Sequence, residues 1–566
     1  MAQEMVLDKN VGVRMRDGAV LSANVFRPRE PGRYPVIMTF GPYGKDVHMS
    51  EVQPPAWEVL KTRYPQILQH TSGKYLVFET PDPEMWVPHG YVVVKVDSRG
   101  AGKSPGKLDA NSPAEFRDFF DAIVWAGAQS WCNGKIGLLG ISYYAAGQWA
   151  IAAQRPPHLA ALLPWQGTPD FFRDRTRSDG IYSAGFLGRW WQRTVLRNQH
   201  GNAESPLHDI DTGERNTGPA ALSPAELAAN REDYLANVLA HPILDDWYRE
   251  RSPDLAQVEL PTLAVANWGG LALHLRGTIA GWLGIGSREK WLKVQSGPYF
   301  ITFLLPETVA MQRRFFDRYL KGIDNGWEKE PRVEVELRSA DDKVKRKIVA
   351  ADWPIPGTQW LKLHLDAGAK ALAAEAPRAA SSASYPALSE GITFSTAPLE
   401  RDVEIAGPVK LRLQLASSTA DADVFATLRA FDPAGKEVVF FSSTAPRAPV
   451  SQGWLRVSQR KLDPAFTTDW RPFHSHDETQ PLTPGAVYEV DVEIWPTSVA
   501  LPKGYRIALT VQGQDFARPG VERDTDTGWF THDDPRDRPP ALFGGTHTLH
   551  TGGGRESYLQ LPVIPG

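Results

Sequence analysis

Several kinds of segment are scarce or missing in this 566-residue sequence, and each shortage excludes a class of protein. The chain has one cysteine, Cys132, which excludes an intrachain disulfide framework and a cysteine-rich metal site. A single thiol fits a reducing compartment, although secreted proteins without disulfides exist. Apolar runs such as Tyr91–Val94 stop at about half a dozen residues, whereas a membrane span needs about 20.

The first ten residues contain neither the basic segment nor the apolar segment of a signal peptide. We therefore expect a soluble, cytoplasmic protein with no membrane partner. The net charge is small, −4, from 62 Lys and Arg against 66 Asp and Glu. Because nucleic-acid-binding proteins normally carry a basic face, we expect no nucleic-acid partner either.

Length and composition indicate a globular protein of more than one domain. The chain is several times longer than a typical domain of ~150 residues, so two or three domains are expected. Hydrophobic residues make up 42% and charged residues 23%, which is typical of folded globular chains rather than disordered or fibrous ones.

Strand patterns alternate with helical patterns in the first part of the chain. Asp17-Gly18 predicts a hairpin between the first two strands. The predicted strands are 11–15, 20–26, 34–40, 91–96 and 135–140, and the predicted helices are 113–128 and 143–153. Strands that alternate with helices indicate a parallel sheet covered on both faces.

The composition and pattern of the sequence then change twice. From about Trp165 to Leu255 the chain is rich in Arg, Trp, Asp and Asn, and 220–239 is strongly helical. Strand patterns return near 261–268 and 290–294 and are followed by a helix at about 308–320, so the middle segment is predicted to be an insertion into the sheet domain.

Beyond Gly326 the pattern is almost entirely that of strands and turns, which predicts a β-sandwich or jelly roll. The predicted organisation is an α/β domain in two parts with a helical cap inserted between them and a C-terminal β-sandwich. Its boundaries are 1–164 and 256–328 for the α/β domain, 165–255 for the cap and 329–566 for the β-sandwich. A second, smaller insertion is predicted at 48–86.

The stretch from Lys135 to Trp149 is the most informative. A buried strand leads into Gly140-Ile141-Ser142 and directly into a helix, which is the context of a nucleophile elbow. In such a turn the serine hydroxyl stands clear of the backbone, and the helix N-terminus directs free N–H groups toward developing negative charge. The alternative is a strand–helix turn with an incidental serine. Tyr144 stands where the motif usually has its second glycine.

Several motifs together resemble the cocaine-esterase/X-prolyl dipeptidyl-peptidase (CocE/NonD) family over nearly the whole chain. They are Gly140-Ile-Ser-Tyr-Tyr144, Gly41-Pro-Tyr-Gly-Lys45, and the segments 96–106, 315–326 and 411–432. The resemblance implies an α/β-hydrolase domain with an inserted helical cap and a C-terminal jelly roll. It also implies a serine hydrolase of esters, amides or acylated amino compounds.

The resemblance assigns three of the site residues. Ser142 corresponds to the nucleophile, and the backbone N–H of Tyr143 and the hydroxyl of Tyr43 correspond to the two oxyanion donors. From its position alone, Tyr43 fits equally a turn tyrosine that caps the sheet.

The rest of the catalytic triad is missing. Gly270 stands where the family has its aspartate, and Tyr299 stands at or near the position of the histidine. The chain has 14 histidines, but none lies between His274 and His364, which is the window where the base is expected.

Three residues are candidates to replace the base. His274 follows Gly270 by four residues and either swings toward Ser142 or packs beneath the cap. Tyr299 is a poor base unless a cation lowers its pKa, and the cation closest to the matching segments is Lys45. His48 is the third candidate, reaching in from the small insertion.

The alternative to hydrolysis is a repurposed pocket. In that case Ser142, Tyr43 and Tyr299 would be hydrogen-bonding groups of a ligand-binding protein, or of an acyltransferase, cyclase or lyase. The cap is rich in aromatic residues, which suits an apolar or aromatic acyl substrate, although most of them fit equally as packing. They are Trp165, Phe171, Phe172, Tyr182, Phe186, Trp190 and Trp191. A homodimer is plausible for a chain of this size.

Three further motifs carry less information. His474-Ser-His476 beside acidic residues has a spacing that ligates metals, but on a turn between strands it is more typical of a solvated loop. Asp524–Gly528 lacks the glutamate of a calcium loop and is predicted to be a turn. Arg99 is expected to form a structural ion pair with a neighbouring loop. We assign no metal and no cofactor.

Overall fold

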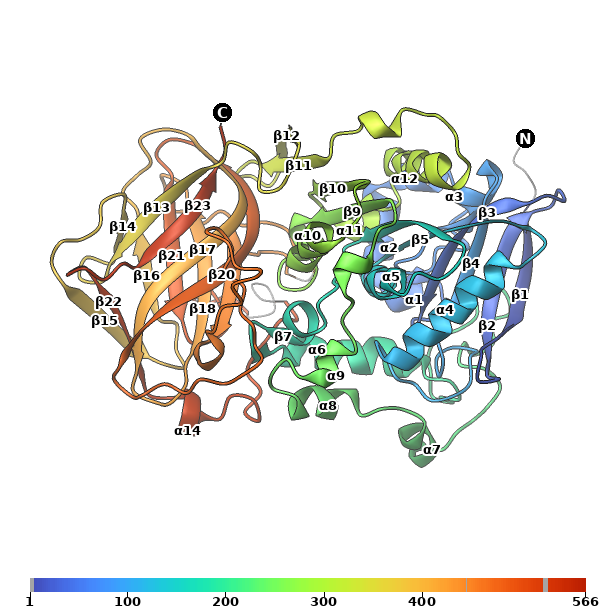
Figure 1. Ribbon diagram of the computed structural model, residues 1–566, viewed down its shortest axis with the longest axis horizontal. Helices are drawn as coiled ribbons and strands as arrows, with labels where there is room; N and C mark the ends of the chain where they lie inside the picture. The colour runs from blue at the N-terminus through green and yellow to red at the C-terminus, as the bar shows by residue number, and fades with distance from the viewer. Residues whose placement is uncertain (1–4, 444, 523–527, 566) are drawn as a thin grey trace.

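The computed structural model describes residues 5–443, 445–522 and 528–565, so all but the last residue of the turn predicted at 524–528 lies outside the described residues. Figure 1 shows two bodies side by side, the α/β domain with its cap and the C-terminal β domain. In the described part of the chain, no helix has both the length and the apolar character that a membrane crossing requires.

Ten strands form the first sheet, in the order β1-β2-β4-β3-β5-β6-β9-β10-β11-β12. The strands from β4 to β11 run parallel, whereas β1–β2, β2–β4 and β11–β12 are antiparallel pairs. Their bounds are β1 (Met5–Arg14), β2 (Val20–Pro28), β3 (Tyr34–Gly41), β4 (Val92–Asp97), β5 (Cys132–Ile141), β6 (Leu159–Trp165), β9 (Thr262–Asn267), β10 (Lys290–Gln295), β11 (Val333–Arg338) and β12 (Val344–Ala350). The predicted first hairpin and parallel sheet are confirmed.

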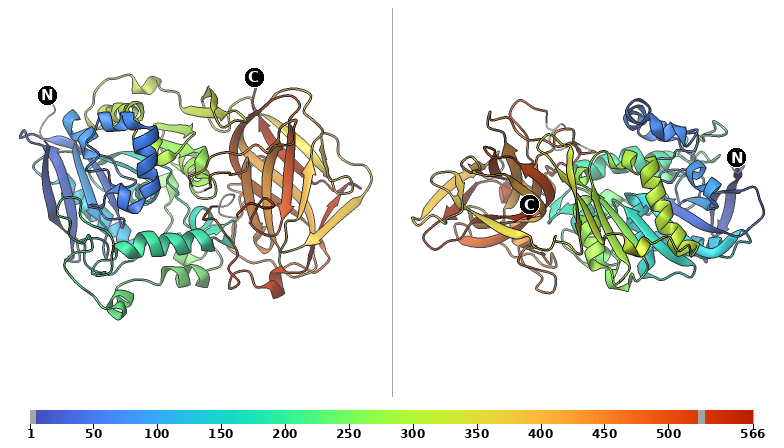
Figure 2. Two further views of the ribbon diagram at one scale, coloured as in Figure 1. Left: turned by 180° about the vertical axis from the view of Figure 1, so that it is seen from behind. Right: turned by 90° about the horizontal axis from the view of Figure 1, so that it is seen from above.

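Helices cover both faces of this sheet (Figure 2). Alternate strand residues such as Met38 and Leu138 face α4 (Pro113–Gly127), α5 (Tyr143–Ala153) and α10 (Leu275–Gly284) in one buried cluster. Their neighbours Ile37 and Leu139 face α12 (Pro306–Leu320) in another. Burial on both faces explains why these strands are nearly continuous apolar runs.

Two insertions interrupt the sheet domain. The smaller lies between β3 and β4 and holds α1 (Met49–Val52), α2 (Pro54–Arg63) and α3 (Pro83–Trp86). The larger, between β6 and β9, forms the helical cap. It contains α6 (Ala184–Trp190), α7 (Pro224–Ala229), α8 (Tyr234–Ala240), α9 (Asp246–Arg249) and a small hairpin of β7 (Arg177–Ser178) and β8 (Ile181–Tyr182). The segment 220–239, expected to be strongly helical, contains two short helices, and Asp233 caps the start of the second, α8.

The C-terminal domain is an eleven-stranded β structure in the order β15-β22-β17-β20-β19-β18-β21-β16-β14-β13-β23. An additional pairing of β17 with β23 closes nine of these strands into a flattened barrel. Their bounds are β13 (Gln359–Asp366), β14 (Ala371–Ala373), β15 (Ser381–Pro386), β16 (Ile392–Ser395), β17 (Val403–Ser417), β18 (Asp423–Phe431), β19 (Ser451–Arg456), β20 (Val487–Leu501), β21 (Arg506–Gln512), β22 (Thr546–Thr551) and β23 (Tyr558–Val563).

The strand Val333–Arg338 falls within the predicted bounds of the β-sandwich, and there the structure differs. This strand, β11, pairs in parallel with β10 and extends the first sheet. It also contacts the β domain, since the Arg338 N–H donates to the Ser498 hydroxyl at 2.9 Å. Without β11, the edge of β10 would present unpaired backbone groups.

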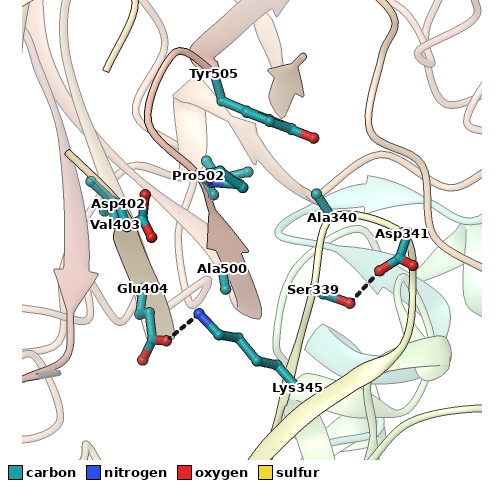
Figure 3. Close-up of a pocket in the computed structure, with 11 residues that line it drawn as sticks. Ser339, Ala340, Asp341, Lys345, Asp402, Val403, Glu404, Ala500, Pro502 and Tyr505 are labelled. Atoms are coloured by element: carbon teal, nitrogen blue, oxygen red, sulfur yellow. Dashed lines mark hydrogen bonds and ion pairs between the residues drawn. The ribbon is translucent and has the colours of Figure 1, made fainter. Parts of the chain in front are cut away.

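A hollow of about 320 Å³ lies at the junction of the two domains (Figure 3). The turn between β11 and β12 forms one side, and the ends of β17 and β20 form the other. Lys345 and Glu404 pair across it at 2.9 Å. Its described lining residues include no histidine that would activate the Ser339 hydroxyl, so it is not where the nucleophile chemistry is expected.

Close packing of β5 against α12 gives a stability prediction. At Gly137 in β5, an added Cβ would lie 2.5 Å from the Phe316 ring. Gly137→Ala should therefore lower the free energy of unfolding by about 1–3 kcal/mol. Gly147→Ala in α5 is the matched control, because its Cβ would lie 3.6 Å from the nearest neighbouring atom. It should be neutral or stabilising by up to about 1 kcal/mol, since alanine favours the helix. Urea unfolding of both variants tests this packing, and equal effects would contradict it.

Candidate active site

Ser142 stands at the turn between β5 and α5 with a left-handed backbone, φ 56° and ψ −112°. A non-glycine residue in this region is strained, which is the geometry of a nucleophile elbow. Tyr144 fits in the first turn of the helix because Gly140 and Gly41 leave room for it. A Cβ on Gly140 would lie 2.5 Å from the Tyr144 Cβ, and one on Gly41 would lie 2.9 Å from the Tyr144 ring. Glycines at other positions therefore make room for Tyr144, which stands where the motif usually has its second glycine.

The Nε2 atom of His274 lies 3.0 Å from the Ser142 Oγ atom. His274 is the residue that precedes α10, and its backbone N–H donates to the Gly270 carbonyl at 2.9 Å. The structure agrees with the first of the two interpretations of His274. Its side chain reaches Ser142 and does not merely pack beneath the cap.

The His274 ring is neutral over the physiological range. Burial, followed by the positive charge of Arg175, lowers the pKa of His274 to about 3. No carboxylate forms an ion pair with its ring among the residues that the structure describes. In the tautomer that carries its proton on Nδ1, the neutral imidazole presents a lone pair at Nε2 and is able to accept the Ser142 proton.

Gly270, where the resemblance places an aspartate, lies three residues after the end of β9. A Cβ there would lie 2.5 Å from the Oε1 atom of Gln166. The Gln166 amide donates to the Asn267 carbonyl at 3.2 Å, and its side chain fills the space that an acidic side chain would need. A larger side chain at position 270 would therefore meet Gln166.

The Tyr43 side chain lines the same cavity as Ser142 and His274. The Trp190 indole N–H donates to the Tyr43 oxygen at 2.7 Å, which leaves the phenolic proton available for another acceptor. Burial, with a further contribution from the Glu79 carboxyl, raises the pKa of Tyr43 well above its ordinary value. Tyr43 is therefore a neutral donor at any ordinary pH.

Tyr143 starts α5, where backbone N–H groups lack an acceptor within the helix. Its side chain points elsewhere, and its hydroxyl donates to a Glu115 carboxyl oxygen at 2.6 Å. The Asn111 N–H in turn donates to the Tyr143 oxygen at 3.0 Å. These bonds fix the first turn of the helix, and with it the direction of the Tyr143 N–H.

Glu79 is a member of the site that the sequence analysis missed. It lies in the small insertion, with φ 64°, and its carbonyl accepts the Ile141 N–H at 3.0 Å, next to Ser142. Burial raises the pKa of its carboxyl well above the ordinary value, although Arg175 and a hydrogen bond with Ser142 act in the opposite direction. The only signal in the sequence was an acidic residue directly after the mostly apolar run Tyr75–Phe78.

Arg175 is the second missed residue. Its side chain is buried, at 9% exposure, and donates to the Asn111 side-chain oxygen at 2.6 Å and to Thr168 at 3.3 Å. In the described part of the chain it forms no ion pair with a carboxylate, and its charge disfavours the protonated form of His274. The cap segment holds many arginines, so the sequence offered nothing to single this one out.

The other proposed replacements for the base do not fit. Tyr299 begins α11 (Tyr299–Thr302) and contacts the His274 ring edge-on at 5.5 Å, but burial raises its pKa and keeps its proton on. Lys45 pairs instead with Asp46 at 2.5 Å. His48 caps α1 and contacts the Gly73 carbonyl at 2.9 Å, away from Ser142.

A cavity of about 150 Å³ opens in front of Ser142 and is lined mainly by aromatic side chains. Trp190 and Phe186 of the cap line it, whereas the other cap aromatics pack elsewhere. Trp529 and Ser443 of the β domain also line it, so all three parts of the chain enclose the site. The volume is small compared with the ~300–1,000 Å³ of typical ligand pockets.

Two of the weaker motifs are resolved by the structure. Arg99 pairs with Asp118 on α4 at 2.7 Å and with Asp17 in the first hairpin at 2.8 Å, which confirms its structural role. The expectation of a solvated loop at His474 and His476 is wrong, because the side chains of both histidines are fully buried.

Comparisons with known proteins agree with this architecture. Residues 17–298 match the X-Pro dipeptidyl-peptidase (S15) family, and residues 325–560 match the X-Pro dipeptidyl-peptidase C-terminal non-catalytic domain. A crystal structure of a CocE/NonD family hydrolase from Staphylococcus aureus is 31% identical, with a TM-score of 0.85 over 99% of this chain and 94% of the other.

The chain belongs to the CocE/NonD hydrolase family. A cocaine esterase from Rhodococcus sp. (strain MB1 Bresler) is 24% identical over 98% of both chains. An α-amino acid ester hydrolase shares the fold, at 17% identity and a TM-score of 0.68 over 99% of this chain and 97% of the other. The expected fold is thereby confirmed, and the protein is an enzyme of the serine hydrolase class.

Proposed function

We propose that this CocE/NonD hydrolase cleaves small esters by acyl transfer through Ser142, with His274 as the general base of a two-residue dyad. The observation that supports this most directly is the 3.0 Å contact between Ser142 Oγ and a neutral His274 Nε2 at a strained elbow. A nucleophile and a base within hydrogen-bond reach are the minimum that this chemistry requires.

The proposed reaction proceeds in two acyl-transfer steps. His274 accepts the Ser142 proton as Oγ attacks the ester carbonyl carbon, and the resulting oxyanion accepts hydrogen bonds from the Tyr43 hydroxyl and the Tyr143 N–H. The tetrahedral intermediate collapses, and the leaving alcohol takes the proton from His274. Water then attacks the acyl-serine in the same way and releases the acid.

Within the residues that the structure describes, no carboxylate pairs with the His274 ring, which limits the rate and favours activated substrates. In a complete triad the acid holds the imidazole and stabilises the imidazolium, and its removal costs about 10⁴ in kcat in a well-studied protease. Here Arg175 instead opposes the imidazolium charge. A weak base suits esters with good leaving groups, and we infer that amides are much poorer substrates.

The cavity favours a substrate with a small acyl group that packs against apolar or aromatic side chains. Its volume of about 150 Å³ and its aromatic lining fit an acetyl-sized group against Phe186 and Trp190. The name of the cocaine esterase relative agrees with an ester substrate. A ligand-binding pocket that uses Ser142, Tyr43 and Tyr299 only as hydrogen-bonding groups gives no reason for the contact between Ser142 and His274.

The dyad predicts which of two neighbouring residues is essential. His274→Ala should reduce kcat for p-nitrophenyl acetate by about 10³-fold or more, because the proton acceptor is lost. Tyr299→Phe changes the residue whose ring contacts His274, and it should keep kcat within a few-fold of the wild-type value. Both are measured beside Ser142→Ala, which should be inactive and should not react with a fluorophosphonate probe. Loss of activity in Tyr299→Phe with retention in His274→Ala would contradict the dyad.

The oxyanion assignment predicts a defect in kcat rather than in KM. Tyr43→Phe removes one donor to the oxyanion and should lower kcat by about 10²–10³-fold with little change in KM. Trp190→Phe is the control, because it removes the bond to the Tyr43 oxygen and leaves the phenolic proton in place. A larger effect of Trp190→Phe than of Tyr43→Phe on kcat would count against this assignment.

The low pKa of His274, about 3, predicts an unusual pH profile. The active form is the neutral base, so kcat/KM should stay level from pH 8 to about pH 5 and fall only below that. If His274 had the ordinary histidine pKa near 6.5, kcat/KM would instead fall about 30-fold by pH 5. Tyr43, Tyr299, Glu79 and Arg175 are the other titratable groups at the site, and Glu79→Gln serves as the control for titration of that carboxyl. A midpoint near pH 6.5 in folded protein would be inconsistent with the buried, unpaired imidazole.

A further inference from the structure

A second cluster of chemically reactive side chains lies away from Ser142, where the cap meets the β domain. Figure 1 shows β7 at this border. The two-residue turn Asp179-Gly180 joins β7 to β8, and both residues have positive φ, as a tight hairpin turn of this length requires. From the β domain, His474 and His476 approach the same turn.

Hydrogen bonds fix the tautomer of each histidine. His474 Nε2 lies 3.0 Å from the Asp491 backbone carbonyl, which only accepts, so this nitrogen carries the proton. His476 Nδ1 lies 2.8 Å from the Oε1 atom of Gln459. The Gln459 amide cannot be reversed, because its Nε2 donates to the Pro242 carbonyl at 3.0 Å. His476 therefore carries its proton on Nδ1.

In their neutral forms both rings consequently direct a lone pair at Asp179. Its Oδ1 atom lies 3.4 Å from His474 Nδ1 and 2.9 Å from His476 Nε2. His474 is buried, at 1% exposure, and its Nδ1 has no hydrogen-bond partner in the described part of the chain. With both rings neutral, three electron-pair donors face one another, an arrangement that a bound cation resolves.

The spacing of these donors fits a metal ion. One donor atom from each residue lies within 4.8 Å of the other two. A zinc ion with bonds of about 2.0–2.1 Å in a tetrahedral site holds its ligands about 3.3 Å apart, between the two distances observed here. Each ring also donates its second N–H to an oxygen, as ligating histidines do.

Neighbouring cations are already neutralised by other carboxylates. Arg173 pairs with Asp170 at 2.6 Å, and Arg276 pairs with Asp174 at 2.6 Å and with Glu493 at 2.8 Å. In the described residues, no lysine or arginine forms an ion pair with Asp179, and the side chains that contact its carboxylate are the two histidines. Gly180 is also required, because a Cβ would lie 2.7 Å from Gln459 Oε1, the atom that orients His476.

We propose that Asp179, His474 and His476 bind a divalent transition-metal ion, with Zn²⁺ the best fit, and that this ion fastens the cap hairpin to the β domain. Two nitrogens and one carboxylate suit zinc better than the oxygen-preferring Mg²⁺ or Ca²⁺. A water molecule would complete the four ligands. Because β-domain residues line the Ser142 cavity, the ion would help to hold that cavity closed.

The direct test is a zinc titration of the full-length protein after treatment with a chelator, at pH 7.5 and with metal content measured by mass spectrometry. We expect about one Zn²⁺ per chain at micromolar free zinc or below, and a thermal midpoint that rises by a few degrees as zinc is added. If wild-type protein takes up no zinc at 100 μM and its thermal midpoint does not change, the proposal is wrong. This result does not depend on any variant folding.

Variants locate the bound ion. Asp179→Asn keeps the shape of the ligand and should weaken zinc binding by about tenfold or more, and His476→Ala should abolish it. His208→Ala, which changes an exposed histidine elsewhere in the cap, should bind as wild type does. Equal binding by all four proteins would place the ion elsewhere and overturn the assignment. Co²⁺ substitution adds a readout, since a tetrahedral site gives intense visible absorption that these two ligand variants should lose.

Discussion

The left-handed backbone of Ser142 is the constraint on which the site depends. It requires a strand that ends at Ile141 and a helix that begins at Tyr143, and it requires glycine at 140 so that Tyr144 fits beneath the turn. Once these are satisfied, the serine oxygen stands at the open end of the sheet and faces a small aromatic cavity. The cap and the β domain act by closing that cavity rather than by supplying the nucleophile.

In the proposed dyad the base comes from a different loop than the resemblance implies. Tyr299 follows β10, and His274, which precedes α10, contacts the Tyr299 ring and lines the same cavity. At Gly270, a larger side chain would meet the Gln166 side chain. A buried arginine lowers the pKa of the imidazole, and a carboxyl that favours its neutral form lines the same cavity.

Much of the fold was predictable from the sequence, because each buried strand is a short apolar run and each cap or hairpin carries its own turn residues. The strand β11 was misassigned because its alternation of apolar and charged residues fits either sheet. Only its pairing with β10 decides between the two sheets. The elbow and the position of Tyr43 could be predicted from local motifs. Glu79 and Arg175 could not, since their importance comes from burial and from charges brought together by the tertiary fold.

The most direct test of the central claim is a crystal structure of the protein after reaction with a small fluorophosphonate. The account predicts a phosphonyl group on Ser142 Oγ, with its oxygen accepting hydrogen bonds from the Tyr43 hydroxyl and the Tyr143 N–H and with His274 Nε2 beside the modified oxygen. An unmodified Ser142, or an adduct whose oxygen points away from both donors, would contradict it.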